Sequence, residues 1–175
     1  LQDGDTVMIL DNSKDFVDVS GNTWGAEAID FTSSRELFNG TGETTFSPTA
    51  HMSRAMMVTV LARLDGVDTS RGATWQEVGC RWAVEQGISD GHAMSEDLTL
   101  EQLVVLLYRY SGSPTVTDSA VETVQTDTVS RWATEAMVWA TKSGILSGND
   151  GFQNAKRSVT RAEAAMIVMQ YLLTD

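Results

Sequence analysis

The fold is decided by a stretch that occurs twice. WATEAMVWATKSGILSG at residues 132–148 repeats the spacing of WQEVGCRWAVEQGISDG at residues 75–91. Two tryptophans, the alanine after the second tryptophan and a final Gly-Ile-x-x-Gly coincide between the copies. A weaker copy begins at Trp24, where Phe31 takes the position of the second tryptophan. Such self-similarity is typical of repeat proteins, in which neighbouring units cover each other's apolar faces.

A second segment follows each copy, and its apolar residues recur with the period of an α-helix. They occupy positions i, i+3, i+4 and i+7, starting at Met57, Leu103 and Ala164. We therefore predict an all-α fold in which three helix–loop–helix repeats pack as a pseudo-threefold helical spindle, with a short extended segment at the N-terminus. The predicted division is an N-terminal extension at 1–15, repeat 1 at 16–66, a degenerate repeat 2 at 67–112, a linker at 113–128 and repeat 3 at 129–175.

Composition excludes several classes of function. The 175 residues include 12 Lys+Arg and 24 Asp+Glu, which gives a formal net charge of −12. Nucleic acid is not an expected partner, because its phosphates require a basic surface. Cys80 is the only cysteine, so an intrachain disulfide and a thiolate zinc site are excluded. Membrane insertion is not expected, because the longest apolar run covers only 103–107. The N-terminal residues do not resemble a signal peptide, so we expect a removed signal or a piece of a larger protein.

Capping signals mark the starts of the second helices. Thr99 with Gln102, and Thr160 with Glu163, have the spacing of a capping box. Ser53 can cap the first of these helices, without a reciprocal partner.

An arginine follows two of these caps, at the first helical position. The positive end of the helix dipole disfavours a cation there by about 0.3–1 kcal/mol. If Arg54 and Arg161 face outward beside free N-terminal amides, they form a site for a carboxylate or phosphate. The alternative is that each arginine pairs internally, with Asp18 or Asp127.

Together these features resemble the S-layer homology (SLH) domain, as three tandem modules over about 16–173. The likeness is carried by Phe16-x-Asp18-Val19, Trp24, a Gly-rich turn, Asp150-Gly151-Phe152 and Val159-Thr160-Arg161-Ala162-Glu163. The resemblance implies a noncovalent anchor that holds a surface protein on the bacterial cell wall. Its implied partner is an anionic, often pyruvylated, secondary cell-wall polysaccharide bound in grooves between repeats. The implied location is extracellular, at the cell wall.

The resemblance also implies the site. The arginine of Thr-Arg-Ala-Glu is expected to meet the acidic sugar, which carries over to Arg161 and, in a variant motif, to Arg54. The full set of implied ligand-binding residues is Arg161, Arg54, Thr160, Ser53, Glu163, Asp18, Asp127, Trp24, Trp75, Trp132, Gly40 and Gly148. No metal, cofactor or enzymatic activity is expected, and the isolated fragment is expected to be monomeric.

Repeat 2 departs from the pattern, with Leu100 in place of the arginine and Glu101 as an added acid near the groove. We therefore predict at most two working sites, with the one at Arg161 the stronger. Trp82 and Trp139 are predicted to pack in the core. For Trp24, Trp75 and Trp132, core packing and stacking on a sugar remain open. Mid-loop Phe46 and Phe152 are predicted to pin their loops to the core, and Cys80 to be buried.

Three other functions are alternatives to an anchor. One is a protein-interaction module that keeps the SLH shape without binding glycan. A second is a glycoside hydrolase using a carboxylate pair such as Glu135 and Glu163, for which the sequence offers no defined separation. The third is a calcium module at Asp11-x-Ser13-x-Asp15, which lacks the glycine and closing glutamate of an EF-hand loop.

Overall fold

The structure is a computed structural model that describes residues 11–117, 128–146 and 154–174. Within these ranges the secondary structure is helical and no strand is present, so the all-α prediction is confirmed. The elements are α1 (Ala26–Ser34), α2 (Arg54–Leu64), η1 (Thr69–Arg71), α3 (Glu77–Glu85), α4 (Leu100–Tyr110), η2 (Arg131–Ala133), α6 (Thr134–Lys142) and α7 (Arg161–Thr174). None of these helices combines the length and apolar character needed to cross a bilayer.

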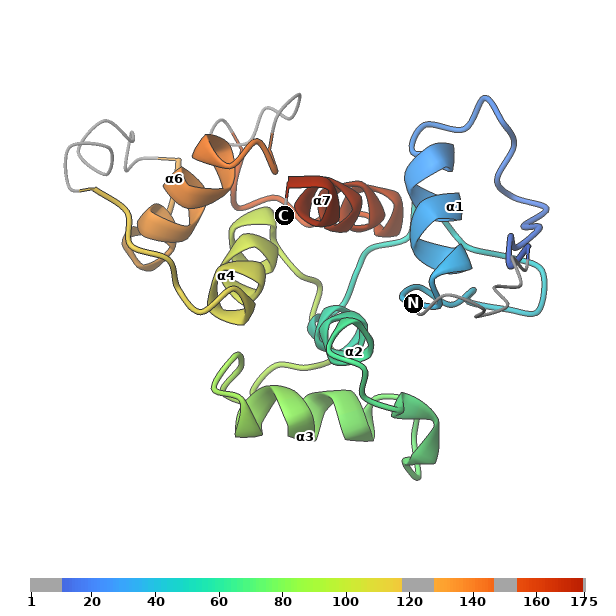
Figure 1. Cartoon of the computed structure of the whole chain (residues 1–175), viewed down its shortest axis with the longest axis horizontal. Coiled ribbons are helices and arrows are strands. Elements are labelled where there is room, and N and C mark those ends of the chain that lie inside the picture. Colours follow the sequence, from blue (N-terminus) through green and yellow to red (C-terminus); the bar gives the residue numbers. More distant parts are fainter. Residues whose placement is uncertain (1–10, 118–127, 147–153, 175) are drawn as a thin grey trace, which may run out of the picture.

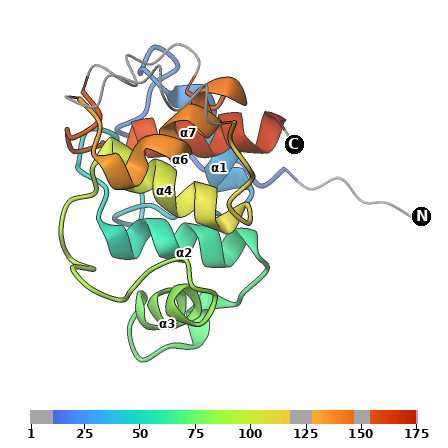
Figure 2. The same ribbon diagram turned by 90° about the vertical axis from the view of Figure 1, so that its left-hand side faces the viewer.

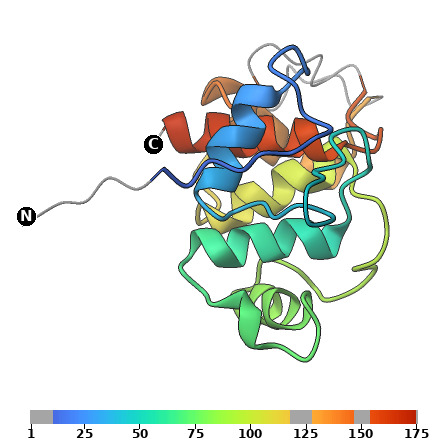
Figure 3. The ribbon, with the colours of Figure 1, turned by 90° about the vertical axis from the view of Figure 1, so that its right-hand side faces the viewer.

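The three predicted second helices, α2, α4 and α7, lie together at the centre, and α1, α3 and α6 lie outside them (Figure 1). Each outer helix packs on one central helix. Helix α3 packs on α2 at one end of the molecule (Figure 2), and α6 packs on α4. Helix α1 packs on α7, which comes from the other end of the sequence (Figure 3). The packing therefore joins the first outer helix to the last central helix.

Backbone hydrogen bonds close this arrangement at the entrances of the central helices. The Met52 N–H donates to the Val159 carbonyl at 2.9 Å, and the Val159 N–H donates to the Leu98 carbonyl at 2.9 Å. The Leu98 N–H completes the ring by donating to the Met52 carbonyl at 2.8 Å. All three side chains are buried. One residue from each chain segment that leads into a central helix thus contributes to a single three-membered ring.

Gly79 explains how closely α3 approaches α2. A Cβ atom at this position would lie 2.7 Å from the Thr59 Cα and 2.7 Å from its Oγ1. We expect Gly79→Ala to lower the free energy of unfolding by about 1–2 kcal/mol, because overpacking at about 1–3 kcal/mol outweighs the higher helix propensity of alanine. Urea unfolding measures the loss. Gly21→Ala is the control, because a Cβ there meets no atom within 4 Å. Equal stability of both variants would mean that the two helices can move apart at no cost.

Candidate functional site

Three of the predicted ligand-binding residues line one cavity of about 350 Å³. Gly40 comes from the loop after α1, Trp75 precedes α3, and Arg161 begins α7. Helix α2 contributes Met56 and Thr59. The cavity therefore gathers residues that are far apart in the sequence, one from each of the three predicted repeats.

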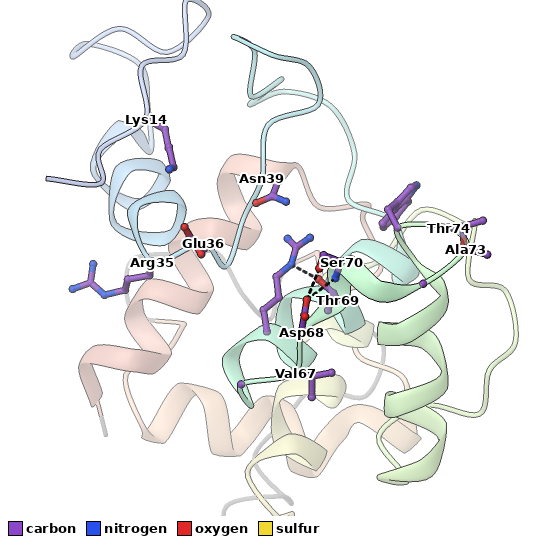
Figure 4. Close-up of a pocket in the computed structure, with 14 residues that line it drawn as sticks. Lys14, Arg35, Glu36, Asn39, Val67, Asp68, Thr69, Ser70, Ala73 and Thr74 are labelled. Atoms are coloured by element: carbon purple, nitrogen blue, oxygen red, sulfur yellow. Dashed lines mark hydrogen bonds between the residues drawn. The ribbon is translucent and has the colours of Figure 1, made fainter. Parts of the chain in front are cut away.

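The cavity continues into a larger, open groove of about 860 Å³, because Asn39, Arg63 and Trp75 line both spaces. The open part runs between the end of α1 and η1, with Lys14 and Glu36 on one side and Asp68 on the other (Figure 4). We call the cavity and the open part together the Trp75 groove.

Arg161 is a buried residue of this groove, with 5% of its surface exposed. Its Nε donates to the Phe46 carbonyl and its Nη2 to the Asn39 carbonyl, both at 2.8 Å. The guanidinium carbon also lies 4.4 Å from the centre of the Phe46 ring. Burial lowers the pKa of Arg161 to about 10, against the charge of Asp18, which raises it. The prediction that the Arg161 guanidinium faces outward and is free is therefore wrong, because two of its nitrogen atoms donate to backbone carbonyls inside the protein.

Asp18 holds the same loop from its other side. Its two carboxylate oxygens accept hydrogen bonds from the backbone N–H groups of Phe46, at 2.8 Å, and Ser47, at 2.7 Å. The Phe46 N–H has the largest effect on the pKa of Asp18, which lies below its ordinary value although burial opposes the shift. Asp18 and Arg161 are therefore linked through Phe46 and make no direct ion pair with each other.

Phe46 is fully buried between these two charged side chains. Its ring centre lies 5.4 Å from that of Phe16 and 6.1 Å from that of Phe38. The prediction that Phe46 pins its loop to the core is confirmed. Phe152, Asp127 and Gly148 lie outside the described residues.

Arg54 occupies the equivalent helix entrance on α2 but has a different environment. It is half-buried, and its side chain makes no hydrogen bond or ion pair with any residue that the structure describes. The backbone N–H of His92 has the largest effect in lowering the pKa of Asp90, and the charge of Arg54 adds to that shift. Of the two predicted arginines, Arg54 thus has the more accessible guanidinium.

The helix-entrance amides are not free, contrary to the prediction. The first two N–H groups of each central helix donate to carbonyls of a neighbouring loop, at 2.8–3.2 Å: Arg54 to Glu96, Ala55 to Met94, Leu100 to Arg157, Glu101 to Ala155, Arg161 to Ala50 and Ala162 to Pro48. The third N–H group of each helix donates to the side-chain hydroxyl of the cap residue: Met56 to Ser53, Gln102 to Thr99 and Glu163 to Thr160. An anion therefore cannot bind these amides without displacing backbone hydrogen bonds.

Thr160 and Glu163 form the predicted capping box. The Thr160 N–H donates to Glu163 Oε2 at 2.8 Å, and the Glu163 N–H donates to the Thr160 hydroxyl at 3.3 Å. Glu163 also pairs with Arg157 at 2.8 Å. Burial raises the pKa of Glu163, but hydrogen bonds from Thr160 and Arg157 outweigh it and hold the pKa below its ordinary value. Both side chains are therefore engaged inside the protein.

The three tryptophans for which the sequence left core packing and sugar stacking open lie on the surface. Trp24, Trp75 and Trp132 are 56%, 52% and 58% exposed, and each precedes an outer α-helix. Trp132 does not share the buried face of α6, because that helix begins only at Thr134 and Trp132 belongs to η2. Trp82 is buried, as predicted.

Trp139 packs against the core, as predicted, although it is not fully buried, and Cys80 is less buried than predicted. Trp139 is half-buried and packs against Tyr108 and Tyr171, with ring centres 5.5 and 6.3 Å away. Cys80 is also half-buried, and burial raises the pKa of its thiol.

Gly40 is required by close packing. A Cβ there would lie 2.7 Å from the carbonyl oxygens of Gly42 and Thr45. Gly91, in the corresponding turn of repeat 2, instead has a φ of +80°, which favours glycine.

Glu101 does not reach a groove, contrary to the prediction. It is buried, and its carboxylate accepts hydrogen bonds from the Ser130 N–H and hydroxyl, both at 2.8 Å. This acid therefore fixes the start of η2. Leu100, beside it, is also fully buried.

Sequence reasoning missed Arg63 and Arg109, in the last turns of α2 and α4. Arg63 Nη1 donates to the Leu37 carbonyl at 3.0 Å, and Arg109 Nη1 donates to the Ile88 carbonyl at 3.0 Å. Both arginines lie nine residues after the first residue of their helix (63 − 54 and 109 − 100), and α7 has Gln170 at that position (170 − 161). Aligning the ends of the helices, and not only their starts, would have found this pair.

The comparisons with known proteins agree with the sequence resemblance. Residues 15–56 and 126–165 match the S-layer homology domain. S-layer homology domains are known for anchoring proteins to the cell wall. The two matched segments include the start of repeat 1 up to the entrance of α2, and repeat 3 up to the first turns of α7. They therefore contain Asp18, Gly40 and Arg161, but not the predicted repeat 2.

Three curated relatives are similar over most of this chain. An endoglucanase of Bacillus sp. (strain KSM-635) is 28% identical, and the match covers 92% of this chain and 19% of that protein. An amylopullulanase of Thermoanaerobacterium thermosulfurigenes is 25% identical, over 89% of this chain and 9% of that protein. The exoglucanase XynX of Acetivibrio thermocellus is 22% identical, over 91% of this chain and 16% of that protein. The chain thus spans less than a fifth of the length of each of these three relatives.

Proposed function

We propose that this chain anchors a surface protein to the bacterial cell wall by binding secondary cell-wall polysaccharide in the Trp75 groove. The observation that carries the proposal is the cavity itself. It gathers Gly40, Trp75 and Arg161 in a chain with two S-layer homology segments. The proposed location is extracellular, at the cell wall, with three tandem modules acting as one unit.

Trp75 is proposed to stack on a sugar ring. Its indole is half exposed at the place where the cavity opens into the wider groove, so a sugar can reach one ring face. An aromatic contact of this kind contributes about 0.5–1.5 kcal/mol beyond the area that it buries.

The charge of the groove favours an acidic polymer. Lys14, Arg35, Arg63 and Arg161 line it, against Glu36 and Asp68. This local excess of cations contrasts with the net charge of −12 for the whole chain. Long-range repulsion is screened beyond about 8–10 Å at physiological salt, so local cations dominate at contact.

We assign Arg161 a supporting role within this site. Because its guanidinium holds the Phe46 and Asn39 carbonyls, it fixes the loop that carries Gly40. Arg63, which is half-buried and lines both parts of the groove, is proposed as the cation that meets the acidic substituent.

The enzyme names of the relatives do not transfer to this chain, which covers less than a fifth of each of them. We propose that the matched region is a noncatalytic module and that the catalysis implied by those names belongs to other parts of those proteins. Incubation with wall polymer should then produce binding without new reducing ends.

Trp75→Ala tests the proposal. Loss of the stacking contact at about 1.4 kcal/mol should raise the Kd for purified wall polysaccharide about tenfold. Retention of the polymer in a pulldown, followed by titration, measures the change. Trp24→Ala is the matched control, because Trp24 is similarly exposed. It precedes α1, which packs on α7, and α7 carries Gln170 at the position where α2 carries Arg63.

Three outcomes separate the parts of the proposal. Unchanged binding by a folded Trp75→Ala variant would remove the groove as the site. If polymer without its acidic groups binds as tightly as intact polymer, the proposed anchoring function stands, but the proposed selectivity for an acidic polymer is wrong. Absence of any polymer binding by the wild type would favour a protein-interaction module.

A further inference from the structure

Asn39 and Gly40 form an asparagine–glycine pair in the loop after α1. Asn39 is the only asparagine of the sequence that a glycine follows. Because glycine has no side chain to shield its backbone nitrogen, that nitrogen can reach the side-chain amide carbon of the preceding asparagine. The pair therefore has the groups needed for deamidation through a cyclic imide, an intramolecular reaction that proximity favours.

Both reacting groups are accessible in the fold. The Asn39 side chain is exposed at the edge of the open part of the Trp75 groove (Figure 4), and it makes no hydrogen bond within the described residues. The Gly40 N–H likewise donates no hydrogen bond in the part of the chain that the structure describes. Neither residue belongs to a helix. Ring formation therefore breaks no hydrogen bond of either reacting group with those residues.

Arg161 acts on the peptide group that joins the two residues. Its Nη2 donates to the Asn39 carbonyl at 2.8 Å. When the Gly40 N–H loses its proton, the negative charge is shared between the nitrogen and this carbonyl oxygen. The buried guanidinium stabilises that oxygen in the same way as a preorganised donor stabilises an oxyanion. Arg161 therefore favours the deprotonation that starts the reaction.

We propose that Asn39 deamidates spontaneously in the folded protein and that the product alters the Trp75 groove. The Gly40 nitrogen loses its proton to hydroxide and bonds to Asn39 Cγ. The bond from Cγ to Nδ2 breaks, and Nδ2 takes up a proton and leaves as ammonia. Water then hydrolyses the ring at either of its two carbonyl carbons, which gives aspartate or isoaspartate. The reaction requires only water as co-reactant.

Both products add a negative charge to the groove. Asn39 lines the cavity as well as the open part, where Glu36 and Asp68 already supply acids. The new carboxylate reduces the local excess of cations to which we assign the attraction of an acidic polymer. This consequence rests on the proposed function, whereas the deamidation itself does not.

Isoaspartate also changes the path of the backbone. The main chain then runs through the former side-chain carbons of Asn39, which inserts a methylene group before Gly40. The loop has little room for this change, because a Cβ atom on Gly40 would lie 2.7 Å from the carbonyl oxygens of Gly42 and Thr45. The carbonyl that now accepts from Arg161 becomes a carboxylate, which can pair with the same guanidinium.

Peptide mapping by mass spectrometry, after prolonged incubation at mildly alkaline pH, tests the modification. We expect Asn39 to deamidate at least about tenfold faster than Asn12 and Asn22, which serine and threonine follow. Labelling by protein isoaspartyl methyltransferase identifies the isoaspartate. Asn39→Gln is the control, because its longer side chain would have to close a larger ring, and it should show no labelling at this position.

A parallel sample in urea gives the rate for the unfolded chain. We expect the native rate at Asn39 to be no less than about a tenth of that rate. A lower native rate would show that the fold protects Asn39 and would overturn the proposal. A rate at Asn39 no higher than at Asn12 and Asn22 would overturn it as well.

Polymer binding by fresh and incubated protein tests the consequence for the groove. We expect incubated wild type to bind purified wall polysaccharide about fivefold more weakly than fresh wild type, as one added charge near a bound anion predicts. Fresh and incubated Asn39→Gln should bind alike, which controls for damage elsewhere. Deamidation at Asn39 without weaker binding would overturn the effect on the groove. If fresh wild type binds no polymer, the proposed function fails, and the mass spectra still decide whether Asn39 deamidates.

Discussion

Arg161→Met is expected to lower the free energy of unfolding by about 2–4 kcal/mol, because it removes two hydrogen bonds from a charged donor to buried or partly buried carbonyls. Methionine keeps much of the side-chain volume, so the loss reports the polar contacts with Phe46 and Asn39. The Asp18 carboxylate also loses the nearby positive charge that acts on it. Urea unfolding, with the midpoint and slope fitted together, measures the change.

Arg54→Met provides the matched control for this prediction. It makes the same substitution at the same helical position of α2, where the side chain has no hydrogen bond within the described residues. We expect a change within about 0.5 kcal/mol, as is usual for surface substitutions. Equal losses from both variants would show that the contacts of Arg161 do not stabilise the fold and that position on the helix decides the effect.

Phe46→Ala is expected to cost about 3–5 kcal/mol, as other large-to-small substitutions of buried aromatic residues do. The ring fills the space between Phe16, Phe38 and the Arg161 guanidinium, so its removal leaves a cavity and exposes a buried cation. Thermal and urea unfolding measure the loss.

Phe46→Leu separates volume from aromatic character at the same position. It fills most of the cavity, and we expect it to recover more than half of the stability lost in Phe46→Ala. Loss of polymer binding in a Phe46→Leu variant that remains folded would indicate that the loop carrying Gly40 has moved. A Phe46→Ala variant as stable as the wild type would contradict the central place of this residue in the core.

The sequence was sufficient for the central helices because their apolar residues recur at helical spacing and a capping residue precedes each of them. The stripes starting at Met57, Leu103 and Ala164 predicted α2, α4 and α7. The capping pairs Thr99–Gln102 and Thr160–Glu163 formed as predicted, because a capping box depends only on residues three apart. Local patterns of this kind do not require knowledge of how the helices pack.

The candidate site was harder to predict because it depends on contacts distant in sequence. The carbonyls that Arg161 binds lie more than 100 residues away, so its burial has no local signal. The helix-entrance amides were expected to be free because their acceptors come from neighbouring loops. Trp132 fits the apolar stripe of α6 in sequence, but the chain enters that helix through a 3₁₀ turn that rotates it outward. The division into domains remains a prediction.

The hydrogen-bonded ring of Met52, Leu98 and Val159 limits how such a chain can grow. In an open solenoid, another unit can be added at the end, because the last unit offers an unfilled surface. Here α7 already accepts α1, so a fourth copy would have to compete with an existing partner. Tighter binding to the cell wall would therefore require duplication of the complete three-repeat unit or substitutions within it, because a single additional repeat would find no unoccupied packing surface.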